Sequence, residues 1–160
     1  MTNPGILLDA IVAQLRAVPL LVAEMGGDAQ RILPYYDEYP KYKDVTRAIA
    51  LLPAPGILVV YEGTSQGGGR MQPWAHQFRL VVKLGEKQPT DTGAVHYAAL
   101  YLLVEGIPTA NPLNLLNMEI NSSCDAMDVP RWQRQSLIVS AAGDSIDYFV
   151  VNWTLTEKSA

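Results

Sequence analysis

Few side chains in this sequence can act as a nucleophile, a base or a metal ligand. There are two histidines, His76 and His96, and one cysteine, Cys124. A single cysteine excludes an intramolecular disulfide and a cysteine-based zinc site. His96 has no His or Glu at metal-binding spacing, so a metal site requires the two histidines to meet in space. We expect His76 to be a satisfied core or interface side chain, and we expect no bound metal or cofactor.

Four aspartates of the C-terminal half lie in or beside predicted turns: Asp125, Asp128, Asp144 and Asp147. Turn aspartates commonly accept hydrogen bonds from nearby backbone amides. A catalytic pair needs one carboxyl with a raised pKa in an apolar pocket. Cys124 lacks a flanking glycine-rich signature, and we find no nucleophile elbow, the G-x-S-x-G turn between a strand and a helix. We therefore expect no enzymatic activity and keep a small hydrolase as an alternative.

The glycine run at residues 67–69 is the remaining candidate for a ligand site. A phosphate-binding loop ends in Gly-Lys-Ser/Thr at the start of a helix, so that backbone amides and the lysine hold the phosphate. Here Arg70 and Met71 follow the glycines, and the next predicted element is a strand. The run is therefore interpreted as a flexible hairpin tip.

Composition indicates one globular domain spanning residues 1–160. Of the 160 residues, 49% are hydrophobic and 18% charged, which is sufficient for a hydrophobic core. The net charge of -4 argues against a general nucleic-acid binder held by phosphate contacts. No basic stretch followed by a long apolar run marks a secretory signal, and the longest apolar stretches are shorter than the roughly 20 residues of a membrane helix. Assembly in the cytoplasm is expected.

The hydrophobic pattern predicts helices and strands in a defined order. Helical spacing predicts an amphipathic helix over residues 6–16 after Pro4, a short helix over 20–25, and a helical turn over 45–52 capped by Asp44. Residues 57–62 and 74–84 are predicted strands of a hairpin whose extended tip spans 63–73.

The second half continues with a helix and three strands. The helix is predicted over residues 93–106, with five residues facing the sheet: Val95, Ala98, Ala99, Leu102 and Leu103. A strand over 118–122 and a final hairpin of 135–141 with 146–156 follow. Paired strands separated by a helix favour an α+β fold with a mixed or mainly antiparallel sheet and helices packed on it.

Two segments are candidate interfaces. Four of the eight tyrosines lie in the proline-punctuated segment 34–43: Tyr35, Tyr36, Tyr39 and Tyr42. Tyrosine is enriched at protein interfaces because it joins a large apolar area to a polar tip. The hairpin tip is the second candidate, and its interface residues are Gly68, Arg70, Met71 and Trp74. A glycine-rich tip of this kind often becomes ordered only against a partner.

With these elements in place, the chain resembles the tail terminator (tail completion) proteins of long-tailed bacteriophages and related head–tail joining proteins. The resemblance rests on element order and size over most of the chain: the helix 6–16, the strand pair 57–62 and 74–84 with its long loop, the helix 94–105, and the strands 118–122 and 147–157. No single residue motif carries it.

The resemblance implies a structural protein of the virion that assembles into a hexameric ring. Such a ring closes the head-proximal end of the tail tube, ends its polymerisation and joins the tail to the head connector. Its implied partners are copies of itself, the tail tube protein and the connector, and DNA passes through the lumen without specific binding. An acidic chain suits such a conduit, because it repels phosphate.

Three alternatives remain open from the sequence. A head-closure or tail tube subunit of the same particle has a similar build, and a tube subunit polymerises alone into filaments. The small hydrolase described above belongs to another class. A small-molecule binding module, with a pocket under the 93–106 helix, is the third alternative.

Overall fold

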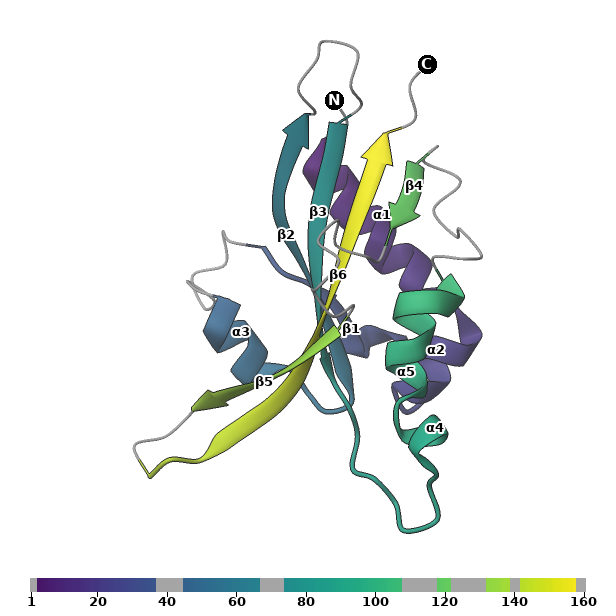
Figure 1. Cartoon of the computed structure of the whole chain (residues 1–160), viewed down its shortest axis with the longest axis vertical. Coiled ribbons are helices and arrows are strands. Elements are labelled where there is room, and N and C mark those ends of the chain that lie inside the picture. Colours follow the sequence, from purple (N-terminus) through teal and green to yellow (C-terminus); the bar gives the residue numbers. More distant parts are fainter. Residues whose placement is uncertain are drawn as a thin grey trace.

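The computed structural model describes residues 3–36, 45–66, 74–107, 118–121, 132–138 and 142–157. Helix α1 (Pro4–Arg16) is followed by the short helix α2 (Pro19–Glu24) (Figure 1). The Asn3 side chain accepts a hydrogen bond from the Gly5 amide at 2.8 Å, and Pro4 occupies the first turn, where its missing amide is not needed. The predicted apolar stripe of α1 is buried: Leu7, Leu8, Ile11, Val12 and Leu15.

The strands described by the structure form one mixed sheet in the order β1-β2-β3-β6-β4, with β5 also paired to β6. Their bounds are β1 Ile32–Pro34, β2 Gly56–Gln66, β3 Trp74–Lys83, β4 Met118–Asn121, β5 Trp132–Ile138 and β6 Ser145–Glu157. β1 runs parallel to β2, whereas β2–β3, β3–β6, β4–β6 and β5–β6 are antiparallel. The predicted α+β class with a mainly antiparallel sheet is confirmed.

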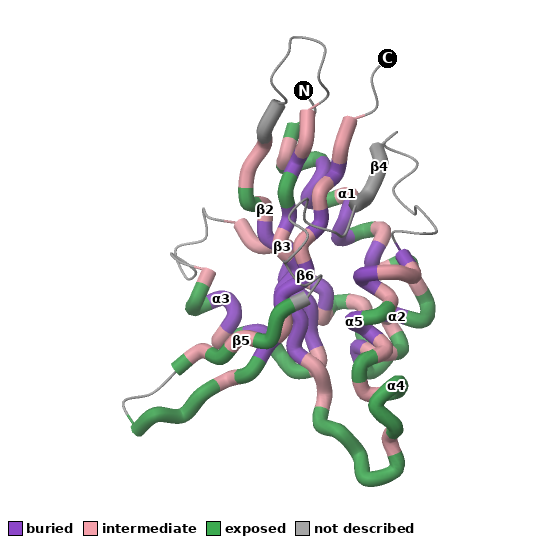
Figure 2. The backbone as a smooth tube through the Cα atoms, in the orientation of Figure 1, coloured by how far each residue is buried: buried purple, intermediate pink, exposed green. Residues whose placement is uncertain are grey.

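Helices cover both faces of the sheet. On one face, α1, α2 and α5 (Ala98–Tyr101) pack on alternate residues of β2, β3 and β6. On the other face, α3 (Val45–Leu51) packs on Leu58, Val60, Val81 and Val150. Figure 2 shows the buried stretch where these strands cross the middle of the molecule. Because both faces are covered, β3 carries consecutive buried residues from Leu80 to Lys83.

β6 is longer than any one of its neighbours, and this creates a projecting hairpin. β3 pairs with β6 only from Phe149 onward, whereas β5 pairs with β6 from Ser145 to Val151. The pairs between 135–138 and 145–148 therefore form a two-stranded segment, called the β5–β6 arm below. In Figure 1 the arm points to the lower left, away from α2 and α5.

The predicted helix over residues 93–106 is present, but it is not one continuous α-helix. The structure divides this segment into α4 (Gly93–His96), α5, and a π-helical segment, η3 (Leu102–Gly106), with Tyr97 at φ -97° and ψ 13° between α4 and α5. Of the predicted sheet-facing residues, Ala99 and Leu103 are buried and Ala98 and Leu102 are partly buried, whereas α4 carries no buried residue. Val95 is 52% exposed, and the buried residues of the segment are Ala99, Leu100, Leu103, Val104 and Ile107.

The strand boundaries differ from the prediction at three places. β1 was not predicted, because three residues that include Pro34 carry no alternation. β2 continues past a bulge between Tyr61 and Gly63, so residues 63–66 are strand rather than loop, and the rest of the predicted tip lies outside the described residues. Gly63 has φ 152°, a conformation that side chains rarely adopt, and this allows the bulge. β5 begins at Trp132 rather than at the predicted residue 135, and residues 139–141 of the predicted strand lie outside the described residues.

The Lys83 side chain links the C-terminal end of α3 to the sheet. Because its pKa is lowered, we expect the stability of the protein to depend on pH. Lys83 Nζ donates to the Leu52 carbonyl at 2.8 Å and to the Ala50 carbonyl at 3.4 Å, at the C-terminus of α3. Burial lowers the Lys83 pKa from 10.5, so between the folded and unfolded pKa values the unfolded chain holds more protons. We therefore expect the unfolding free energy of the native protein, relative to Lys83→Met, to rise as the pH increases toward 10.5. Urea unfolding of both proteins over a pH series measures this difference, and a flat difference contradicts it.

Candidate functional site

Tyr35 and Tyr36 follow β1 and lie on opposite faces of the sheet. The Tyr35 amide donates to the Val59 carbonyl at 2.9 Å, which extends the β1–β2 pairing and keeps the alternation of side chains. Tyr35 packs against the core under α3, whereas Tyr36 packs against the main core and donates its hydroxyl hydrogen to Asp9. The other two tyrosines of the predicted interface, Tyr39 and Tyr42, lie outside the described residues.

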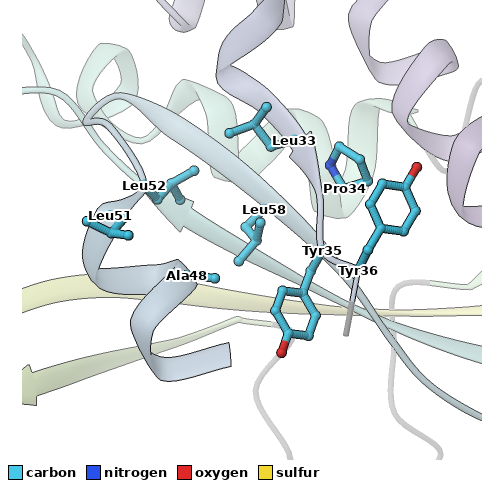
Figure 3. A pocket seen from close by; sticks show the side chains of 8 residues that line it. All are labelled: Leu33, Pro34, Tyr35, Tyr36, Ala48, Leu51, Leu52 and Leu58. Atoms are coloured by element: carbon cyan, nitrogen blue, oxygen red, sulfur yellow. The ribbon is translucent and has the colours of Figure 1, made fainter. Parts of the chain in front are cut away.

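Both tyrosines line an apolar cavity of about 210 Å³ between β1 and α3. Figure 3 shows its lining: Leu33, Pro34, Tyr35, Tyr36, Ala48, Leu51, Leu52 and Leu58. Leu51 is 59% exposed at its mouth. Tyr35 and Tyr36 are both half-buried and border this cavity, but their side chains point to opposite faces of the sheet and do not form one surface (Figure 3).

Of the predicted hairpin-tip interface, the structure describes Trp74 alone. Trp74 begins β3, pairs with Gln66 of β2 and is half-buried. Gly68, Arg70 and Met71 lie outside the described residues. The β2–β3 hairpin next to them is held by an ion pair between Arg79 Nε and Glu62 Oε1 at 2.6 Å, where Glu62 occupies the bulge.

His76 lies on β3, is fully buried and is linked to β2 and β6. Its Nδ1 lies 3.1 Å from the Thr64 hydroxyl, and its Nε2 lies 2.9 Å from Glu157 Oε1. The Thr64 hydroxyl also contacts the Tyr61 hydroxyl. The prediction of a satisfied histidine on the apolar face is confirmed, because both ring nitrogens have partners.

This network has the order hydroxyl, imidazole, carboxylate that acyl-transfer enzymes use. Residues 63–67 also read G-T-S-Q-G, so the expectation that the chain lacks a G-x-S-x-G sequence is wrong. The context differs from an elbow, because the described residues 63–66 belong to a strand in which Ser65 pairs with Ala75 of β3. His76 is 0% exposed, and neither the α3 cavity nor the groove described below includes a member of the network. We therefore interpret it as a structural link.

Asp147 does not have the raised pKa of a general acid. Asp147 lies on the arm, where it accepts hydrogen bonds from the Ser136 hydroxyl at 2.5 Å and from Arg134 Nη2 at 2.7 Å. These two bonds lower the pKa of Asp147, whereas a general acid needs a raised one. Cys124, Asp125 and Asp128 lie outside the described residues. No group of three or more His, Cys, Asp or Glu that could hold a metal occurs in the described part of the chain.

An apolar groove lies between α2 and the α4–α5 segment, beside the 93–106 helix under which the binding-module alternative places a pocket; the part of α2 was not predicted. The volume of the groove is about 600 Å³, and its lining residues are Leu20, Ala23, Glu24, Ala94, Tyr97, Ala98, Tyr101 and Leu102. Four of these, Ala94, Tyr97, Ala98 and Tyr101, recur at helical spacing on the side of the segment that does not face the sheet. This second apolar stripe was the available signal, because a helix with one buried stripe is normally polar elsewhere.

No protein-family model matches the chain, and no curated protein matches it significantly. Within the described residues, no helix has the length and apolar character required to cross a membrane.

Proposed function

We propose that this chain is a structural protein of a long-tailed bacteriophage virion. In this role its copies form a hexameric ring at the head-proximal end of the tail tube. The ring ends tube polymerisation and joins the tail to the head connector. DNA passes through the lumen without specific binding, in keeping with a net charge of -4.

The observation that carries this proposal is the exposed apolar surface of the helices. Leu20, Tyr97 and Tyr101 are 68%, 41% and 61% exposed, and all three line the groove between α2 and α5. A contiguous apolar surface of this kind usually marks a protein–protein contact. The α+β fold, the β2–β3 hairpin and the terminal strand β6 supply the element order on which the resemblance to tail terminators rests.

The direct test is termination of tube growth. The purified protein is added, in amounts far below those of the subunit, to polymerising tail tube protein of the same phage, and tube lengths are measured by electron microscopy. We expect shorter tubes with a ring at one end. Tubes of unchanged length and without rings would contradict the proposal, and bovine serum albumin at the same concentration serves as the control.

The tube-subunit alternative uses the same kind of surface, and the protein alone can be tested for it. Native mass spectrometry over a concentration series separates the two functions. A discrete closed oligomer supports the terminator, because heterologous contacts that close make a ring. An open ladder of sizes supports the tube subunit.

The hairpin tip supplies a prediction for this function. We expect Arg70→Ser together with Met71→Ser to weaken ring assembly by about tenfold while the monomer stays folded, because interface anchors dominate binding. Sedimentation velocity measures assembly, and circular dichroism measures folding. Lys87→Ser, an exposed change on the loop after β3, is the matched control. Normal assembly of the double variant would remove the tip from the interface.

A further inference from the structure

The groove between α2 and the α4–α5 segment has the size and the lining of a small-molecule site. Its volume of about 600 Å³ falls within the roughly 300–1,000 Å³ of ligand pockets. Such pockets are mostly apolar and carry a few polar groups that orient the ligand. Here three of the eight lining residues are alanines, which leave room for an apolar body beside Leu20 and Leu102.

Glu24 is the one charged residue among the described residues that line the groove. It is half-buried, and within the described part of the chain its carboxylate has no hydrogen-bond or ion-pair partner. Arg134 lies beside Tyr97, but its guanidinium is paired with Asp147 at 2.7 Å. The groove therefore holds a negative charge that no cation of the described chain compensates.

This charge selects the kind of ligand that can fill the groove. A neutral apolar ligand would take water away from the Glu24 carboxylate and replace it with nothing, which is costly. An anion would be repelled by the same carboxylate. A cation replaces the lost water with a direct charge interaction, so the electrostatics of the groove favour a positively charged ligand.

Two tyrosine rings add a second attraction for a cation. Tyr97 and Tyr101 line the same groove, and the face of an aromatic ring attracts a cation that lies within about 6 Å. The Tyr97 ring makes edge contacts with His96 and Phe149, at centroid distances of 4.8 Å and 6.0 Å, so this part of the wall is already positioned. Tyr101 is 61% exposed and has room to move against a ligand.

We propose that the groove binds a small organic cation, a protonated or quaternary amine on an apolar body. The apolar body lies against the alanines and leucines, and the positive charge lies near Glu24 and the tyrosine rings. This inference goes beyond the proposed function, because it assigns a ligand class to the groove and does not depend on ring formation. A ligand and a protein contact would share this surface, so an occupied groove would be closed to a partner protein.

The probe is benzyltrimethylammonium, which joins an aromatic body to a quaternary amine. It is titrated into the full-length protein at a concentration at which sedimentation velocity shows a monomer, and the backbone amide NMR shifts are followed. We expect saturable shifts of the amides of α2, α4 and α5. Benzenesulfonate, which carries a negative charge on the same ring, should leave these amides unchanged.

Three variants test the residues that are assigned to the cation. Glu24→Gln should weaken binding of the probe by about tenfold, and Tyr101→Leu, which keeps an apolar side chain but removes the ring, by about threefold. Glu86→Gln removes an exposed carboxylate outside the groove, and this matched control should bind like the native protein. Circular dichroism checks that each variant is folded.

Four results would each overturn the inference: no saturable binding of benzyltrimethylammonium, shifts confined to amides outside the groove, an equal response to benzenesulfonate, or unchanged binding by Glu24→Gln. The termination of tube growth is measured separately. A groove that does not bind the cation therefore leaves the proposed ring untouched, and tubes that are not terminated leave the ligand site untouched.

Discussion

Trp153→Ala is expected to lower the free energy of unfolding by about 3–5 kcal/mol, the usual range for removing a large buried aromatic side chain. Trp153 is 1% exposed and lies in the middle of β6, where it belongs to the core under α1, α2 and α5. Urea unfolding followed by far-UV circular dichroism measures the loss. A decrease below about 1 kcal/mol would contradict this position of the side chain.

Trp153→Phe separates packing from hydrogen bonding. The indole Nε1 donates to the Leu103 carbonyl at 2.8 Å in a buried position. Leu103 lies in the π-helical segment, where the Ile107 amide bonds to Leu102, so the amide that would reach Leu103 belongs to residue 108. Residue 108 is a proline and has no N–H. The phenylalanine variant therefore leaves a buried carbonyl without this donor.

We expect Trp153→Phe to cost about 1–3 kcal/mol, the penalty for an unsatisfied buried polar group together with a partial cavity. Trp74→Phe is the matched control, because Trp74 is half-buried at the start of β3. Equal stability of the Trp153→Phe variant and the native protein would show that another donor satisfies Leu103. Hydrogen exchange of the α5 and η3 amides reports whether the loss is local.

Much of the fold follows from local patterns. The stripe of α1 and the alternation of β6 from Val151 onward each indicate one buried face, because these stretches pack against a single layer. The prediction for residues 93–106 was partly wrong for a related reason. Apolar residues occur on two sides of it, so periodicity alone does not identify the side that faces the sheet. The structure buries Leu100 and Val104 and leaves Val95 exposed.

The candidate site was less accessible to sequence reasoning than the fold. The groove exists because α2 lies next to α5, and this proximity results from packing between segments far apart in the chain. The arm depends on where β3 stops pairing with β6, which is a property of register. The sequence selected the tyrosine segment and the hairpin tip by composition. Those choices stay predictions, and the structure adds that Tyr35 and Tyr36 contribute to different cores.

Gly56→Ala is expected to destabilise the protein by about 1–3 kcal/mol through overpacking. A Cβ at Gly56 would lie 2.2 Å from the Pro53 backbone oxygen and 3.2 Å from the Leu52 side chain. The backbone oxygen cannot rotate away as a side chain can, so the connection between α3 and β2 has to shift. The same connection carries the Leu52 carbonyl that binds Lys83, and Lys83 pairs with Gly56 in the β2–β3 register.

The loss at Gly56 should therefore extend to α3. Faster hydrogen exchange of the α3 amides, together with a lower urea midpoint, is the expected result. Gly85→Ala is the matched control, because its Cβ would meet Pro55 at 3.6 Å, an ordinary contact distance. If both alanine variants unfold at the native midpoint, the connection has room that the structure does not show. If Gly56→Ala alone loosens α3, the glycine is required because the C-terminus of α3 and the start of β2 pass within contact distance of each other.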